Sequence, residues 1–294
     1  MGGRALWNFE AIGTSWEIET SRALDATVHA EVERVIDAFD GEWSRFREDS
    51  VVTALSREGG AVAVPRDAAA MLDAYAELSG ATDGAVNPLV GDALARRGYD
   101  AGGSFVDRGP KPAPADWRER LRWDDERLTL DGPALIDVGA LGKGRLVDLV
   151  MAVVMRAVPG DVVVDASGDL AVRGRPQRIG LEHPFDPRRA IGVWEVTDAA
   201  LCASATNRRA WGDGLHHVLD ARTGVPVQTI AATWVVAGSA MRADALATAL
   251  FFDGGPRLAH DWGCEWVRMT TDGKVEWSPG CRAELFVRTG SVER

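Results

Sequence analysis

Apolar residues recur every three to four positions along several stretches of the chain, which is the spacing of a helix with one buried face. The clearest stretch covers residues 24–39, and a short helix is expected directly after the capping residues Asp49 and Ser50. A further helix follows Pro65 and ends before Gly80. The pattern predicts helices at 24–39, 51–55, 66–79, 145–158 and 240–252.

Short runs rich in β-branched residues predict strands between these helices. The turn Asp131-Gly132 separates the runs 128–130 and 134–138, which is a hairpin signal. Residues 101–116 contain three Gly and three Pro and are expected to form a loop. Further strands are predicted at 162–164, 170–172, 191–196, 234–237, 266–270 and 283–287.

The order of these elements indicates an α+β fold, because helices and strands occur in blocks and do not alternate strictly. We find no repeat period, and no long Pro/Gly/Ser-rich linker divides the 294 residues. We therefore expect one domain over residues 1–294, in which any second lobe shares an interface with the first.

Composition and charge exclude several classes of protein. The chain is 46% hydrophobic and 26% charged, which is typical of a globular protein and excludes disorder, collagen and coiled coil. The net charge of -11 and the scattered basic residues argue against nucleic acid and anionic membranes as partners. The three cysteines form no C-x-x-C pair, which fits reduced thiols and makes a thiol zinc site improbable.

Two regions bear on location. The first fifteen residues contain Arg4, Asn8 and Glu10 where a signal peptide needs an unbroken apolar core. The longest apolar stretch, 234–252, contains Arg242 and Asp244, and both charges would be buried if it crossed a bilayer. We therefore expect a cytoplasmic protein that does not enter membranes.

A glycine-rich stretch, Asp137-Val138-Gly139-Ala140-Leu141-Gly142-Lys143-Gly144, leads into a predicted helix. Glycines let backbone N–H groups approach an anion, a helix start adds a favourable dipole, and Lys143 adds positive charge. These features are typical of a phosphate-binding turn, although the glycine spacing is not that of a Walker A loop. The alternative is a tight strand-to-helix turn with a solvated lysine, and the stretch alone leaves both interpretations open.

Asp244 and Thr248 lie four residues apart in the last predicted helix, so their oxygens share one helix face. Two hard oxygen donors at this spacing suit Mg²⁺. The alternative is that Thr248 bonds back to the carbonyl of Asp244 while Asp244 pairs with a basic side chain. In either case a carboxylate in so apolar a helix needs compensation.

Two adjacent histidines precede a short apolar run and a Thr-Gly turn, in the segment His216-His217-Val218-Leu219-Asp220-Ala221-Arg222-Thr223-Gly224. A histidine held by a rigid loop can act as a general base. The alternative is one histidine facing water on a strand and one packed ring.

Together and in this order, the segments resemble the ApbE-type flavin transferases, which are FAD:protein FMN transferases. The resemblance covers nearly the whole chain. It implies two closely packed lobes with mixed or antiparallel sheets and the flavin site in the cleft between them. The segments that carry it are 12–14, 44–50, 82–88, 137–148, 167–169, 217–224 and 243–248.

The resemblance implies Mg²⁺-dependent transfer of FMN from FAD to a Thr or Ser hydroxyl of an acceptor protein, with release of AMP. The acceptor would carry a Ser/Thr-Gly-Ala-Thr-like motif. His217 would be the base that deprotonates this hydroxyl, and a histidine with its ordinary pKa of about 6.5 can take a proton at neutral pH.

The implied ligands and contacts fall on eleven further residues. The Mg²⁺ ligands are Asp244, Thr248 and the main-chain oxygen of Ala140. The flavin and nucleotide contacts are Ile12, Phe46, Ala85, Val86, Asn87, Asp137, Lys143 and Leu219.

The chain departs from the family pattern at three places. Asn87-Pro88-Leu89 replaces a common Asp-Pro-Thr, Ala203-Ser204-Ala205 replaces the usual Thr-Ser-Gly, and Ala221 replaces a Pro. These changes bear on flavin contacts and substrate preference more than on the fold. The expected lack of an export signal favours a cytosolic acceptor.

Two other functions remain open from the sequence. One is a Mg²⁺-dependent FAD pyrophosphatase, in which water replaces the acceptor hydroxyl, and the other is a flavin-binding protein without catalysis. Ser79-Gly80-Ala81-Thr82 also resembles the acceptor motif, so self-flavinylation stands beside the simpler interpretation of a helix end at Gly80.

Overall fold

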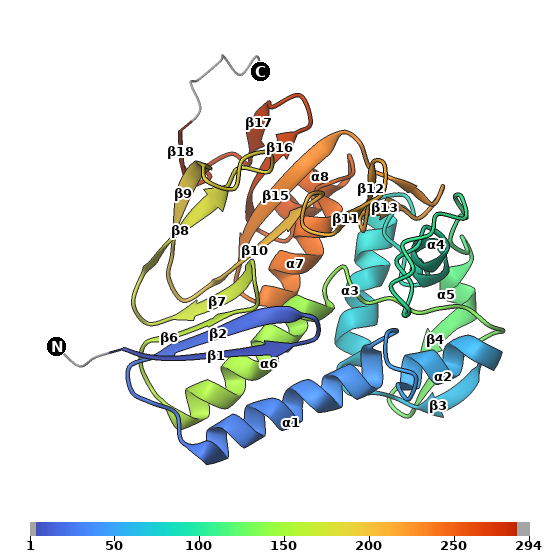
Figure 1. Ribbon diagram of the computed structural model, residues 1–294, viewed down its shortest axis with the longest axis horizontal. Helices are drawn as coiled ribbons and strands as arrows, with labels where there is room; N and C mark the ends of the chain where they lie inside the picture. Colours follow the sequence, from blue (N-terminus) through green and yellow to red (C-terminus); the bar gives the residue numbers. More distant parts are fainter. Residues whose placement is uncertain (1–3, 287–294) are drawn as a thin grey trace.

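The computed structural model describes residues 4–286, in which eight helices pack against antiparallel sheets (Figure 1). The helices are α1 (Ala26–Trp43), α2 (Val51–Glu58), α3 (Ala68–Ala81), α4 (Gly91–Arg96), α5 (Trp117–Arg120), α6 (Gly142–Ala157), α7 (Ala240–Ala249) and α8 (Gly255–Asp261).

The main sheet has eight strands in the order β1-β2-β6-β7-β10-β15-β16-β17, and every neighbouring pair is antiparallel. Its strands are β1 (Ala5–Ala11), β2 (Thr14–Thr20), β6 (Val162–Asp165), β7 (Asp169–Arg173), β10 (Ala200–Ala205), β15 (Ile230–Ala237), β16 (Glu265–Thr270) and β17 (Val275–Trp277).

The remaining strands form four small sheets. The sheet β3-β5-β4 contains β3 (Gly60–Ala63), β4 (Leu121–Trp123) and β5 (Arg127–Leu130). The sheet β18-β9-β8 contains β8 (Gln177–Glu182), β9 (Ala190–Val196) and β18 (Glu284–Leu285). The two-stranded sheets pair β11 (Ala210–Trp211) with β12 (Leu215–His216), and β13 (Leu219–Asp220) with β14 (Val225–Pro226).

The core lies on both faces of the main sheet. Helices α6 and α7 pack on β6, β7, β10 and β15, and α1 packs on α6 (Figure 1). A second hydrophobic cluster, which includes the buried Trp194, joins the other face to β8 and β9. Strand β15 is covered on both faces, so every residue in it is buried. Its polar Thr233 is satisfied by donating to the carbonyl of Ala247 at 2.7 Å.

All five predicted helices are present, with ends that shift by up to four residues. Ser50 caps α2 as expected, because its hydroxyl oxygen accepts a hydrogen bond from the N–H of Thr53 at 3.1 Å. Helix α3 does not end before Gly80 and continues to Ala81. The loop over 101–116 is confirmed.

The predicted hairpin around Asp131-Gly132 is wrong. Strand β5 pairs instead with β3 and β4, and residues 134–138 form no strand. The backbone of Asp137 is used elsewhere: its N–H donates to Pro88 at 2.8 Å, and its carbonyl accepts from the Tyr75 hydroxyl at 3.0 Å. These contacts replace the ladder that a second hairpin strand would need.

The other predicted strands coincide with β6, β7, β9, β15 and β16. Of the strand predicted at 283–287, only Glu284–Leu285 form β18, and Val287 lies outside the described residues. The α+β class with antiparallel sheets is confirmed, whereas the division into two lobes and the single domain over 1–294 stay predictions. Among residues 4–286, no helix is both long and apolar enough to cross a membrane.

Candidate active site

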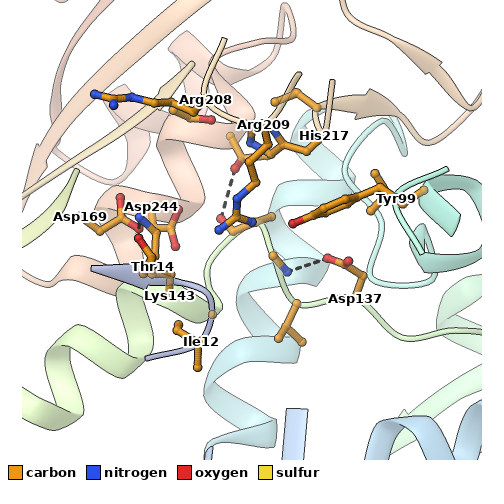
Figure 2. Close-up of a pocket in the computed structure, with 18 of the residues that line it drawn as sticks. Ile12, Thr14, Tyr99, Asp137, Lys143, Asp169, Arg208, Arg209, His217 and Asp244 are labelled. Carbon is orange, nitrogen blue, oxygen red and sulfur yellow. Dashed lines mark hydrogen bonds and ion pairs between the residues drawn. The ribbon is translucent and has the colours of Figure 1, made fainter. Parts of the chain in front are cut away.

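A cavity of about 910 Å³ is lined by all twelve residues that the sequence singled out. They come from separate parts of the chain: the β1–β2 turn, the α1–α2 loop, the segment after α3, the start of α6, the segment around β12 and β13, and α7. Figure 2 shows Lys143, Asp169 and Asp244 on one side of this pocket and Asp137 with Tyr99 on the other. The structure brings the residues together, and the role of each stays a prediction.

The contact between α6 and α7 positions Asp244. The backbone N–H of Gly144 donates to Oδ2 of Asp244 at 2.9 Å. A Cβ atom at Gly144 would lie 2.3 Å from the carbonyl oxygen of Ala240, so only glycine permits this approach. The carboxylate of Asp148 on α6 also accepts from the N–H groups of Ala240 and Met241, at 2.8 and 2.9 Å. These bonds hold the first turn of α7 against α6.

Lys143 lies between two buried carboxylates. Its Nζ is 3.0 Å from Oδ2 of Asp169 and donates to the carbonyl of Ala166 at 2.9 Å. Burial lowers the pKa of Lys143, but Asp169 and Asp244 outweigh it and raise this pKa above its ordinary value. Lys143 is therefore not the solvated lysine of the alternative interpretation. Its charge is already shared with protein carboxylates.

Asp244 is 7% exposed, and its pKa is raised well above the ordinary value, first by burial and then by the charge of Asp169. Within residues 4–286 no basic side chain lies within 4 Å of it, so the expected alternative of an ion pair is not found. The back-bond alternative is also not found, because the hydroxyl of Thr248 instead donates to the carbonyl of Ala140 at 3.3 Å.

This side of the cavity fits a divalent cation. Lys143 pairs with Asp169, whereas the buried carboxylate of Asp244 has no ion pair among residues 4–286 and needs compensation. Asp244, Thr248 and the Ala140 carbonyl are hard oxygen donors of the kind Mg²⁺ prefers. The described part of the chain contains no cluster of three or more His, Cys, Asp or Glu side chains that could hold a metal. The predicted set contains only one such side chain.

The opposite side of the cavity contains a balanced pair. Arg45 is 4% exposed, and its Nε lies 2.5 Å from Oδ2 of Asp137. Its Nη1 donates to the carbonyl of Tyr99 at 2.8 Å, and its guanidinium lies 4.2 Å from the ring centre of Phe46. The other oxygen of Asp137 accepts from the N–H of Gly139 at 2.7 Å.

The two histidines have different surroundings. His216 is buried in β12, where its Nε2 lies 2.8 Å from the carbonyl oxygen of Val227. His217 lines the cavity, and its Nδ1 is buried without a hydrogen-bond partner among residues 4–286. Burial, followed by the nearby charge of Arg209, lowers the pKa of His217 to about 3. The ring is therefore neutral at pH 7 and a weaker base than the ordinary pKa implied.

Comparison with known proteins decides the family. The sequence pattern that defines the ApbE family matches residues 12–266. The chain belongs to the ApbE family. It is 32% identical to a FAD:protein FMN transferase of Rhodobacter capsulatus, over 51% of this chain and 31% of that protein. It is 28% identical to a FAD:protein FMN transferase of Treponema pallidum, over 83% of this chain and 77% of that one. The chain thus spans about a third of the length of the Rhodobacter relative.

Solved structures of the ApbE family share the fold. The ApbE protein of Thermotoga maritima superimposes with a TM-score of 0.82 at 23% identity, covering 94% of this chain and 97% of that one. The flavinyl transferase ApbE of Pseudomonas stutzeri, in its apo form, gives 0.77 at 24% identity, covering 94% and 93%. At these identities the likeness establishes the fold alone.

Several residues of this ApbE-family site were not identified as site residues from the sequence. Arg45 and Asp169 lie inside segments that carried the resemblance, but neither was given a role. Tyr99 and Arg209 lie outside the predicted helices and strands and outside the segments that carried the resemblance, so no signal marked them. Asp148 lies in a predicted helix, where a carboxylate resembles any exposed acidic residue.

Two departures from the family pattern are accommodated locally. Asn87 is 4% exposed, and its side chain donates to the carbonyl of Pro114 while accepting from the N–H of Leu89, both at 2.8 Å. Ala203 and Ala205 lie in β10 and line the cavity.

The acceptor-like sequence 79–82 belongs to the end of α3. Ser79 is 8% exposed and accepts from the indole N–H of Trp117 at 3.0 Å, and Thr82 is 3% exposed. Both hydroxyls are therefore turned to the interior, which favours the helix-end interpretation over self-flavinylation.

Proposed function

We propose that this ApbE-family chain transfers FMN from FAD to a Thr or Ser hydroxyl of an acceptor protein and releases AMP, with Mg²⁺ as cofactor. The observation that carries the proposal is the meeting in one cavity of a neutral histidine, an unpaired buried carboxylate and the residues expected to contact flavin. Two relatives named FAD:protein FMN transferase support it.

The cavity suits a dinucleotide in size and lining. About 910 Å³ lies at the upper end of the range for small-molecule sites. Phe46, Tyr99, Val86 and Leu219 give it apolar and aromatic walls that can contact a planar ring. The charged groups gather around the start of α6 and around His217, where a pyrophosphate would find its partners.

The reaction needs a base and positive charge. The oxygen of the acceptor hydroxyl forms a bond to the phosphorus of the FMN half, and the bond from that phosphorus to the bridging oxygen breaks. His217 takes the hydroxyl proton, and AMP leaves with the bridging oxygen and its electron pair. His217 is neutral at pH 7, so it has an unprotonated ring nitrogen for this proton, but its pKa of about 3 makes it a weaker base than an ordinary histidine.

Asp244, Thr248 and the carbonyl of Ala140 would hold the Mg²⁺ ion. When bound, the ion supplies positive charge that stabilises the phosphate oxygens as negative charge grows on the leaving group. Gly144 and Asp148 position Asp244 for this task through the α6–α7 contact.

The three cysteines Cys202, Cys264 and Cys281 are free, which supports a reducing compartment and an acceptor in the cytoplasm. We propose an acceptor segment with a Ser/Thr-Gly-Ala-Thr-like sequence, in which the modified hydroxyl is exposed.

The test is incubation of the purified chain with FAD, Mg²⁺ and a protein that carries such a segment. We expect covalent flavin on the acceptor by mass spectrometry, with one AMP released for each flavin attached. His217→Ala should keep FAD binding but lose about 10²–10⁴ of the transfer rate. Transfer by His217→Ala at the wild-type rate would contradict the role of His217.

A parallel incubation omits the acceptor. Slow AMP release without acceptor, and fast release with it, is the expected result. Fast release of AMP without acceptor would instead identify a FAD pyrophosphatase.

A further inference from the structure

Two charged side chains of the cavity, Arg209 and Asp244, form no ion pair with any residue from 4 to 286. Among the basic residues of the cavity, Arg45, Arg47, Lys143 and Arg208 each have a carboxylate within 4 Å. Within residues 4–286, Arg209 has no such ion pair and its guanidinium makes no hydrogen bond. Asp244 is the corresponding acidic residue, and it faces the proposed cation site.

The local fold directs Arg209 into the cavity. Strands β11 and β12 form an antiparallel ribbon in which Ala210 lies opposite His216. The next pair along this ribbon is Arg209 and His217, and the N–H of His217 donates to the carbonyl of Arg209 at 3.2 Å. Opposite residues of an antiparallel ribbon project from the same face, so Arg209 lies beside the proposed base.

Figure 2 shows the side chain of Arg209 extending into the middle of the pocket, whereas the neighbouring Arg208 points away from the other labelled side chains. Arg208 instead pairs with Glu182 at 2.9 Å on the rim. The charge of Arg209 is felt at both His217 and Asp244, because it contributes to lowering the pKa of each. A partnerless guanidinium so placed lies between the base and the cation site.

We propose that Arg209 binds the pyrophosphate of the dinucleotide substrate. The planar guanidinium donates parallel N–H bonds to two phosphate oxygens, a geometry that a lysine ammonium lacks. Lys143 cannot take this role alone, because its ammonium is engaged by Asp169 and Ala166. Arg209 is exposed at the surface of the cavity, so its replacement leaves the folded core intact.

This inference rests on the proposed function for the identity of the dinucleotide, but its chemistry requires only a diphosphate. Three ligands distinguish a failure of this inference from a failure of the proposed function. FAD carries both flavin and diphosphate, ADP carries a diphosphate without flavin, and riboflavin carries the flavin ring without phosphate.

The experiment measures the dissociation constants of the three ligands in Mg²⁺ for wild type, Arg209→Ala, Arg209→Lys and the control Arg188→Ala. The side chain of Arg188 is 90% exposed and does not line the cavity. Arg209→Ala should weaken FAD and ADP by about 10- to 100-fold and leave riboflavin within about twofold. The dissociation constants of Arg209→Lys for FAD and ADP should lie between those of Arg209→Ala and wild type. Lysine keeps the positive charge but cannot donate two parallel N–H bonds. Arg188→Ala should bind all three ligands as wild type does.

Two results would overturn the inference. One is FAD and ADP binding to Arg209→Ala with wild-type affinity. The other is an equal loss for riboflavin, which would show that the β11–β12 ribbon had rearranged. If wild type binds ADP in an Arg209-dependent way but does not bind FAD, the proposed function fails and the inference stands. If wild type binds neither, both fail.

Discussion

The two sides of the cavity each contain a buried acid and base, but their charges balance differently. On one side a single carboxylate, Asp137, meets a single guanidinium, Arg45, at 2.5 Å. On the other side Lys143 pairs with Asp169 at 3.0 Å, while the buried Asp244 has no ion pair among residues 4–286. Buried charges are costly unless they are compensated. The first side therefore pairs its two charges within the protein, whereas on the second side a bound cation would neutralise the carboxylate of Asp244.

The largest expected effect tests the unbalanced side. Asp244→Asn keeps the shape and removes the charge, so FMN transfer should fall about 10³-fold or more as the Mg²⁺ ligand is lost. In thermal unfolding, wild type should gain melting temperature on addition of Mg²⁺, and the variant should gain none. Without Mg²⁺ the variant should be at least as stable as wild type, because a strained buried carboxyl is gone. A variant that Mg²⁺ still stabilises would refute the assignment of Asp244.

On the side with the Arg45–Asp137 pair, loss of one partner should lower the free energy of unfolding. Arg45→Ala leaves the carboxylate of Asp137 buried without its partner and should cost about 3–5 kcal/mol of unfolding free energy. Urea unfolding measures this loss. Arg178→Ala is the matched control, because Arg178 pairs with Glu284 at 3.2 Å with both side chains more than 60% exposed. That pair should contribute about 0–1 kcal/mol. Equal losses in the two variants would contradict the comparison.

His217 offers a third case, a titratable ring that lacks a carboxylate partner. Its pKa in the folded chain is about 3, against an ordinary value of 6.5. Between pH 6.5 and 3 the unfolded chain therefore binds a proton on His217 that the folded chain does not. Stability should fall as the pH drops through this window, with His217 contributing at most about 1.4 kcal/mol per pH unit.

His217→Gln should reduce this acid-dependent loss, which urea unfolding at pH 7 and pH 5 measures. His260 has a side chain that is 86% exposed, so His260→Gln serves as the control and should keep the wild-type slope. An unchanged slope in His217→Gln would show that folding does not lower the pKa of His217.

The smallest effect concerns the loop that carries Arg45 and Phe46. The hydroxyl of Ser50 caps α2 and donates to the carbonyl of Ser44 at 2.6 Å. Ser50→Ala should cost about 1 kcal/mol and raise the KM for FAD, because the loop loses an anchor beside the cavity. Asp25 caps α1 at its far end, so Asp25→Ala should cost a similar amount with an unchanged KM. An equal change in KM in both variants would remove the link between this cap and the site.

Local patterns predicted the helices well because each has a buried stripe or a clear cap. They failed where neighbours in space decide the structure. Strand β10, with the sequence Ala-Leu-Cys-Ala-Ser-Ala, lacks β-branched residues because it packs closely against α7. The run 134–138 looks like a strand, yet Pro88 and Tyr75 use its backbone groups.

The candidate site was predictable where it follows the order of family segments, as for Asp244 and His217. The charge balance around Lys143 could not be predicted, because the sequence does not say which carboxylates lie near its ammonium. Nor could sequence show that Arg209 points into the cavity and Arg208 away, since that depends on the register of β11 with β12.

The pocket walls join parts of the chain that are far apart in sequence. Gly144 bonds Asp244 one hundred positions later, and the hydroxyl of Ser167 donates to the carbonyl of Ser15, 152 positions earlier. During synthesis the N-terminal part leaves the ribosome first. The cavity lining therefore cannot be complete until α7 has been synthesised. A nascent chain therefore cannot form the proposed flavin site until α7 has emerged, and we expect a product truncated before α7 not to bind FAD.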